Sequence, residues 1–297
     1  MSSISDFISS FANVKEINRG WSVDRKYYLQ DTHGKDLFLR TFDLSQYKRK
    51  KQEFEVMQAL YTIDVPIAQP IKLGKCDDGG YVLTGWIEGK SLSKDIASFP
   101  EIVQHSLGMR SGEILRRMHS IIPTQLTDAQ EQFRKFERKM DYVFNRYGKS
   151  DLSLPGVDKV FSYISENKYL VENRPQTFMH MDFGAGNIML ENGKLKIVDF
   201  ETFDFGDPWQ DLRKINANTF NPNFATGIIR GYFNGEPPAE FWSLLALYTL
   251  LEAVNIACWA STKSPKNLEN AKKYYDRIFK GFNFHEVQID VPAWYLA

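Results

Sequence analysis

The stretch that decides the fold reads HMDFGAGNIMLENGKLKIVDF and covers residues 180–200. Asp182 and Asn187 stand near its start, five residues apart, with two glycines between them. Two short apolar runs follow, joined by an Asn-Gly pair, which is the strongest short-range signal for a β-hairpin. The second run ends at Asp199, so the hairpin is expected to bring Asn187 and Asp199 side by side, with Asp182 in the loop just upstream.

An amide oxygen and a carboxylate next to a second carboxylate are the groups that phosphoryl transfer needs. Mg²⁺ takes hard oxygen ligands and keeps phosphate oxygens in its coordination shell. A nearby carboxylate can orient the attacking hydroxyl and accept its proton. We therefore expect Asp182 to be the catalytic base, and Asn187 and Asp199 to bind Mg²⁺. Residues 182–184 spell Asp-Phe-Gly, a metal-binding motif of kinases. The metal-binding Asp of a kinase follows the Asn ligand and the hairpin, whereas Asp182 precedes Asn187. We therefore assign this position to Asp199 and not to Asp182.

Strand and helix signals divide the chain into two regions. Apolar runs and turn residues predict strands at 27–29, 37–42, 71–73 and 81–83, and helical spacing predicts a helix at 46–61. Helical periodicity dominates later and predicts helices at 101–120, 128–147, 157–172, 222–234, 238–260 and 264–281. The sequence therefore predicts an α+β fold with a small β-rich lobe at 1–88 and a large, mainly helical lobe at 89–297.

Composition and charge argue against several classes of protein. Lys+Arg and Asp+Glu both number 37, so the chain lacks the basic excess typical of a nucleic-acid binder. The densest basic cluster, Lys48–Lys51, stands at the start of a predicted helix and is expected to be a solvated face. The two cysteines, Cys76 and Cys258, lie far apart and match neither a disulfide framework nor a zinc motif.

The sequence also bears on the cellular compartment. Residues 1–14 show no basic region followed by a long apolar core, so no signal peptide is expected. Phe241–Ala260 is about long enough to span a bilayer, but Glu252 and Asn255 interrupt it, and a charge at that depth is costly. We therefore expect a buried helix there, no membrane partner and a cytoplasmic protein. The sequence leaves the oligomeric state open.

Three segments together resemble the aminoglycoside phosphotransferase and choline kinase superfamily. They are residues 180–187, Ile197-Val198-Asp199-Phe200 and Gly206–Leu212, and the resemblance extends over most of the chain. It implies a bilobal, protein-kinase-like fold. It also implies that the protein uses ATP or GTP with Mg²⁺ and phosphorylates a hydroxyl group of a small-molecule acceptor.

The same resemblance assigns roles to individual residues. Asp182 is implied to be the base, and Asn187 and Asp199 are implied to be the metal ligands. Asp211 matches a buried aspartate that supports the catalytic loop structurally. His180 also fits a structural role, because the kinase mechanism requires no imidazole acid.

A nucleotide site in the first lobe is implied as well. The family pairs a basic strand residue, matched by Arg40, with a Glu on the following helix. Glu53 is the better match than Glu55, because it shares a helix face with apolar residues. The glycine-containing loop that ends at Ser22 is expected near the phosphates, and the connector Gly85-Trp86-Ile87 is expected to contact the base through its backbone.

The chain departs from the family pattern at three places. Met181 stands where Gly is common, and Arg40 stands where Lys is common, although some branches use Arg. The loop at 18–22 contains a single glycine. These departures leave open a nucleotide-binding scaffold without transferase activity, against which the presence of Asp182, Asn187 and Asp199 argues.

Four residues are candidates for the acceptor site: Glu201, Asp204, Glu252 and Trp259. The three carboxylates, together with Asp207, could form an acidic pocket for a polycation, and Glu201 could instead be a second metal ligand. Trp259 belongs to an aromatic set with Trp242 and Tyr248, for which core packing is favoured over a cage for a quaternary ammonium group. The resemblance alone favours an aminoglycoside-type acceptor, with choline, ketosamine, macrolide and sugar kinases as alternatives. A protein kinase ranks last, because the chain lacks an Ala-Pro-Glu segment and a long activation loop.

Overall fold

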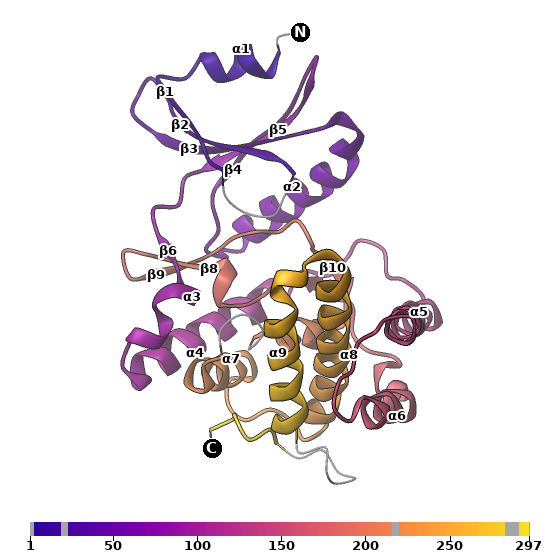
Figure 1. The fold of residues 1–297 in the computed structure, drawn as a ribbon. Helices are drawn as coiled ribbons and strands as arrows, with labels where there is room; N and C mark the ends of the chain where they lie inside the picture. The colour runs from indigo at the N-terminus through magenta and orange to yellow at the C-terminus, as the bar shows by residue number, and fades with distance from the viewer. Residues whose placement is uncertain (1–2, 19–22, 216–219, 283–290, 297) are drawn as a thin grey trace. The chain divides into compact units, whose positions relative to one another are not determined.

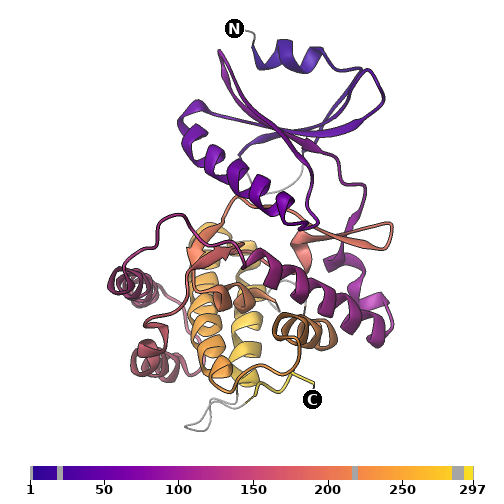
Figure 2. The ribbon, with the colours of Figure 1, turned by 180° about the vertical axis from the view of Figure 1, so that it is seen from behind.

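The computed structural model describes residues 3–18, 23–215, 220–282 and 291–296, and the chain forms two compact units. The first unit contains Met1–Leu92 and Asn187–Phe203, and the second contains Ser93–Gly186 and Asp204–Ala297. Figures 1 and 2 show the ribbon from opposite sides. Strands dominate the first unit and helices dominate the second, as the sequence predicts.

Five antiparallel strands make the sheet of the first unit, in the order β1-β2-β3-β5-β4. Successive side chains of a strand point to opposite faces, so each face has its own set of partners. One face buries apolar side chains against α1 (Ile4–Ser9), where Phe7 stacks on Tyr81. The strands are β1 (Asn13–Glu16), β2 (Arg25–Gln30), β3 (Asp36–Phe42), β4 (Pro70–Cys76) and β5 (Gly79–Gly85).

Helix α2 (Tyr47–Thr62) lies on the side of the sheet opposite α1 (Figure 1). Its Phe54 packs with Phe42 and Val82. Lys50 and Glu53 lie one turn apart on the buried side of α2, and the Lys50 side chain is only 1% exposed. The expectation of a solvated face at 48–51 is therefore wrong for Lys50, because helical spacing places it on the inward side with Glu53.

The predicted hairpin is present in the first unit. Strands β8 (Ile188–Glu191) and β9 (Lys194–Ile197) pair with Ile188 opposite Ile197. Asn192 and Gly193 both have positive φ, of 49° and 76°, as a tight turn between antiparallel strands requires. The short strand β6 (Lys90–Ser91) adds a third member to this sheet.

Helices α4 (Glu101–Met118) and α7 (Pro222–Phe233) touch backbone to backbone in the second unit. A Cβ atom added to Gly112 would collide with the carbonyl oxygen of Ile228, and one added to Gly231 would collide with that of Met109. The other α-helices described after α4 are α5 (Ala129–Gly148), α6 (Val157–Asn167), α8 (Glu240–Lys263) and α9 (Leu268–Gly281). Strand β7 (Thr177–Met179) pairs with β10 (Asp204–Gly206), and a 3₁₀ helix follows at Pro208–Lys214. The short helix α3 (Leu92–Asp95) precedes them.

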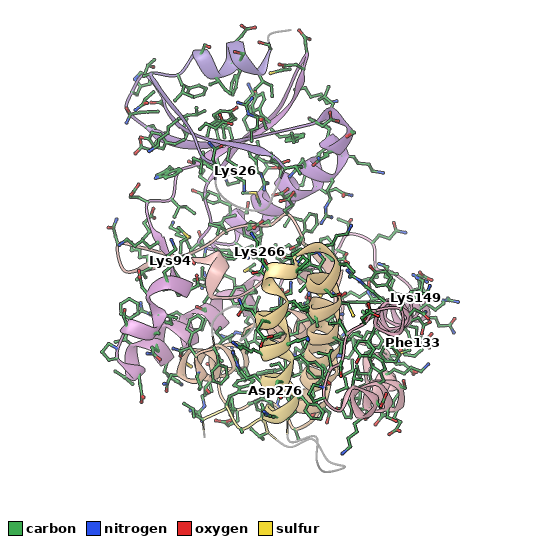
Figure 3. The ribbon with its side chains drawn as sticks, in the orientation of Figure 1. Lys26, Lys94, Phe133, Lys149, Lys266 and Asp276 are labelled. Carbon is green, nitrogen blue, oxygen red and sulfur yellow. The ribbon has the colours of Figure 1, made fainter. Side chains whose placement is uncertain are left out.

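The long helix α8 is the core helix of the second unit. By length and composition it could cross a membrane, but 83% of its most apolar window is buried within the structure. Side chains fill the space between α8 and its neighbouring helices (Figure 3). The buried helix expected at 241–260 is therefore present.

Candidate active site

Asp211 holds the loop that carries Asp182. One carboxylate oxygen of Asp211 accepts a hydrogen bond from the backbone N–H of His180 at 2.6 Å, and the other accepts from the N–H of Met181 at 2.6 Å. Asp182 follows directly, and its own N–H points at Nδ1 of His180 at 3.3 Å. His180 is fully buried, so both residues expected to support the loop occupy its buried side.

Two residues that the sequence analysis did not identify complete this support. His119, at the end of α4, lies 3.1 Å from the Asp211 carboxylate through Nε2, and its Nδ1 lies 2.9 Å from the hydroxyl of Tyr232 on α7. An ionised Asp211 can only accept, so Nε2 of His119 is the donor in this hydrogen bond. Burial raises the pKa of Asp211, but the hydrogen bond and charge of His119, with the charges of His180 and Arg213, outweigh burial and lower the pKa overall.

Met181, which stands where the resemblance leads us to expect glycine, has a backbone conformation that favours glycine. Its φ is 68°, in the left-handed region that residues other than glycine rarely adopt. Its N–H donates to Asp211, and its carbonyl accepts from Nη2 of Arg213 at 3.1 Å. Hydrogen bonds on both sides of the residue therefore hold the strained conformation.

The hairpin of the first unit positions Asn187 and Asp199. The carbonyl of Asn187 accepts a hydrogen bond from the N–H of Val198 at 3.0 Å, so Asn187 and Asp199 occupy neighbouring positions at the open end of the hairpin. Asp199 has a φ of 69°, which turns the chain immediately after β9. Asp182 belongs to the second unit, five residues before Asn187 in the sequence.

These two residues fit Mg²⁺ by the chemistry of their donors. One supplies an amide oxygen and the other a carboxylate. Within the described ranges, no group of three or more His, Cys, Asp and Glu side chains could hold a metal ion alone. Mg²⁺ suits such a site, because it usually takes one or two protein ligands and fills its shell with phosphate oxygens and water.

An ion-pair network surrounds Arg40 in the first unit. Arg40 and Glu53 form the predicted pair, with their side chains 11% and 2% exposed. Lys50 contacts Asp24 at 2.5 Å and Glu201 at 3.3 Å. Burial lowers the pKa of Arg40, but the charges of Glu53, Asp24 and Glu201 outweigh burial and raise it overall. The sequence analysis missed Asp24 and Lys50, since their pairing depends on contacts between distant segments.

Arg49 connects the same helix to the segment that follows Asp199. Its Nη2 donates to the carbonyl of Phe203 at 2.6 Å and to that of Glu201 at 3.2 Å. Its guanidinium lies over the Phe203 ring, 3.8 Å from the centroid. Arg49 and Lys50 together therefore bind α2 to residues 201–203.

The connector between the predicted lobes borders a cavity of about 260 Å³. The N–H groups of Gly85 and Trp86 donate to the carbonyls of Gln69 and Asp36, at 2.9 and 3.2 Å, so both are engaged within the first unit. The Trp86 ring contacts Tyr28 and Phe38. The cavity is lined by Lys35, Asp36, Tyr61, Ile67, Ala68, Gln69, Gly85, Trp86, Ile87, Glu191 and Lys196. Ser22 lies outside the described residues.

Glu252 is enclosed by three cations. Lys139, Lys214 and Arg213 approach its carboxylate at 3.2, 3.6 and 3.5 Å. Burial raises the pKa of Glu252, but the charges of Arg213, Lys139 and Lys214 outweigh burial and lower the pKa from 4.5 to about 2. Lys214 also contacts Asp182, with 3.1 Å between Nζ and Oδ1.

The other acceptor candidates have different surroundings. Asp204 is exposed, and its Oδ1 accepts from the N–H of Phe205 at 2.8 Å. Core packing is confirmed for Trp242 and Tyr248, which are buried, but it is wrong for Trp259, which is 42% exposed. Glu201 belongs to the network of the first unit.

Solved structures of low sequence identity share this fold. A thermostable mutant of aminoglycoside phosphotransferase APH(4)-Ia, in a ternary complex with ADP and hygromycin B, has a TM-score of 0.67 at 15% identity, over 93% of this chain and 96% of that chain. A choline/ethanolamine kinase family protein from Mesorhizobium loti has a TM-score of 0.65 at 16% identity, over 95% and 93%. ADP-bound aminoglycoside phosphotransferase APH(2'')-Ib has a TM-score of 0.64 at 15% identity, over 91% and 95%.

These matches confirm the predicted protein-kinase-like fold. A search of curated protein sequences found no match. The model of the phosphotransferase enzyme family matches residues 13–242, which include the Arg40 network, the Asp182 loop, the hairpin and Asp211. This match spans most of the 297 residues, and the chain therefore belongs to the phosphotransferase enzyme family.

Proposed function

We propose that this protein transfers the γ-phosphate of ATP or GTP, in the presence of Mg²⁺, to a hydroxyl group of a small molecule. The observation that carries the proposal is the pair of hydrogen bonds from the loop of Asp182 to Asp211. These bonds fix the backbone on which a catalytic base would stand, and phosphoryl transfer depends mainly on such positioning. Family membership supports the reaction class.

Asp182 orients the acceptor hydroxyl and takes its proton as the oxygen bonds to phosphorus and the nucleoside diphosphate leaves. Asn187 and Asp199 hold Mg²⁺, which neutralises phosphate charge when it is bound. Arg40, fixed by Glu53, provides a cation for the phosphates. Ser22 lies near the phosphates in this proposal.

The lobe at 1–88 binds the nucleotide in this proposal, and the lobe at 89–297 binds the acceptor. At the connector, Gly85 and Trp86 already use their N–H groups within the first unit, and the Gly85 carbonyl accepts from the Thr84 hydroxyl. The backbone of Ile87 is therefore proposed to contact the base. A cytoplasmic location agrees with a nucleoside triphosphate as donor.

Aminoglycosides are the acceptor class that the resemblance favours. The similar structures include complexes with hygromycin B, gentamicin and streptomycin. The candidates Glu201, Asp204 and Trp259 would contact the acceptor in this scheme, and Glu201 must first leave its ion pair with Lys50. Glu252, the fourth candidate, is already engaged by Lys139 and Lys214 and keeps these ion pairs. Choline, ketosamine, macrolide and sugar acceptors complete the panel to be tested.

The test measures Mg²⁺-dependent consumption of ATP and GTP with each acceptor, and without one, for the wild type and Asp182→Asn. The variant is expected to lose at least about 100-fold in kcat while nucleotide KM changes little, because the base acts in the transfer step. Asp276→Asn, on the exposed side of α9, is the matched control and should behave as the wild type (Figure 3). A wild type no faster than Asp182→Asn would refute the proposal and favour a nucleotide-binding scaffold.

A further inference from the structure

We propose that Lys214 is a positioning residue for Asp182 and that the buried Glu252 fixes Lys214 in this role. The inference rests on the proposed function, because it concerns the same carboxylate. Lys214 Nζ lies 3.1 Å from Oδ1 of Asp182 and 3.6 Å from Oε1 of Glu252. The lysine therefore links the proposed base to a residue of the core helix α8.

The position of Lys214 in its own helix supports this role. It ends the 3₁₀ helix Pro208–Lys214, which also contains Asp211. Residues three apart in a 3₁₀ helix project on the same side. Asp211 holds the loop by its backbone at residues 180 and 181, and Lys214 holds the next residue by its side chain. One short helix thus fixes both the main chain and the carboxylate of the loop.

Glu252 restricts the lysine to one arrangement. A lysine side chain on a protein surface is flexible, and its freedom opposes a fixed contact. Here the Lys214 side chain is 22% exposed, and the Glu252 side chain, at 7%, is buried and held by Arg213 as well. The second carboxylate therefore pre-organises the ammonium group before the reactants bind.

A fixed cation beside Asp182 has two effects during transfer. It keeps the carboxylate aimed, so that less reorganisation is needed when the acceptor hydroxyl arrives. It also offsets the repulsion between the carboxylate and the anionic γ-phosphate. The proton of the acceptor still passes to Asp182.

The chain offers a matched control in Lys139. This lysine contacts the same carboxylate of Glu252 at 3.2 Å, and the structure gives it no contact with Asp182 among the residues it describes. Lys214→Met and Lys139→Met each remove one ammonium group from Glu252, but only the first removes a cation from Asp182. We expect Lys214→Met to lower kcat about 10- to 100-fold with nucleotide KM within about twofold, and Lys139→Met to lower kcat less than about threefold.

A double-mutant comparison separates positioning from general destabilisation. In the Asp182→Asn background, Lys214→Met is expected to change the residual turnover less than about twofold, because the carboxylate it positions is gone. Lys214→Arg keeps the charge and should recover most of the lost kcat. Lys214→Gln, which also lacks the charge, replaces the Met variant if that variant does not fold.

Two results would overturn the inference: equal losses of kcat for Lys139→Met and Lys214→Met, or the same loss for Lys214→Met in both the wild-type and Asp182→Asn backgrounds. Failure of the proposed function is recognised separately, by a wild type no faster than Asp182→Asn. In that case the role of Lys214 falls with it.

Discussion

Replacing Glu252 by Gln tests how much a single buried carboxylate contributes to the stability of the second unit. The three cations around it lower its pKa from 4.5 to about 2. At about 1.4 kcal/mol per pKa unit, this difference corresponds to about 3 kcal/mol of stability at pH 7. Removal of one partner from a buried ion pair costs a similar amount, about 3–5 kcal/mol, because the remaining charges are left uncompensated.

The pH dependence of this term has a definite sign. A carboxylate whose folded-state pKa is lowered contributes its full stability above the unfolded-state pKa and loses it as the pH falls through the folded-state pKa. For Glu252 the window runs from about 4.5 down to about 2. The wild type should therefore exceed Glu252→Gln by about 3 kcal/mol at pH 7 and by roughly half of that at pH 3.

Urea unfolding of both proteins at the two pH values measures this difference directly. Glu55→Gln serves as the control, because Glu55 is 56% exposed and lies 3.6 Å from an equally exposed Lys51. Such a pair contributes less than about 0.5 kcal/mol. A loss below about 1 kcal/mol for Glu252→Gln at pH 7, or a loss that does not shrink at pH 3, would contradict the reasoning.

Two further predictions concern the backbone. Gly112→Ala should reduce the free energy of unfolding by at least about 2 kcal/mol, because its Cβ would collide with the carbonyl of Ile228. The control is Gly148→Ala, at the last position of α5, where a Cβ meets nothing within 4 Å; this variant should be neutral or stabilising. Equal shifts of the unfolding midpoint for the two variants would refute this prediction. Met181→Gly should be about 1 kcal/mol more stable than Met181→Ala, because both variants lose the Met side chain and only glycine adopts a φ of 68° without strain. A higher thermal unfolding midpoint for the Ala variant than for the Gly variant would show that the backbone at residue 181 is not strained.

The sequence predicted best the features that depend on local patterns. The turn at Asn192 and Gly193 and the apolar runs beside it define a hairpin without reference to the rest of the chain. Helical spacing alone placed Glu53 on the inward face of α2, where it meets Arg40. The nucleotide-binding and metal-binding roles of these residues stay predictions.

Features that depend on distant partners escaped the sequence analysis. Lys50 looked like part of a solvated basic run, because nothing local shows that Asp24 and Glu201 surround its ammonium group. Glu252 was a candidate for binding a cationic acceptor, and the cations that neutralise it come from α5 and from the 3₁₀ helix. Charge pairing across a fold is set by tertiary contacts, which a single sequence does not display.

Short elements were missed for a different reason. Helix α1 has six residues, too few for a periodic pattern, although Ser3 and Asp6 form a capping box at its start. Strands β7 and β10 have three residues each and lie more than twenty residues apart in sequence. Such pairs become visible only when the surrounding helices bring them together.

The attachment of α2 to residues 201–203 has a mechanical consequence. Arg49 contacts the carbonyl groups of Glu201 and Phe203 and the face of the Phe203 ring, and Lys50 contacts the carboxylate of Glu201. Asp199 stands only two residues before Glu201 in the chain, so a tilt of the helix pulls on the residue proposed to bind the metal. A nucleotide that shifted Arg40 and α2 would therefore also shift Asp199, because the contacts of Arg49 and Lys50 connect the helix to residues 201–203.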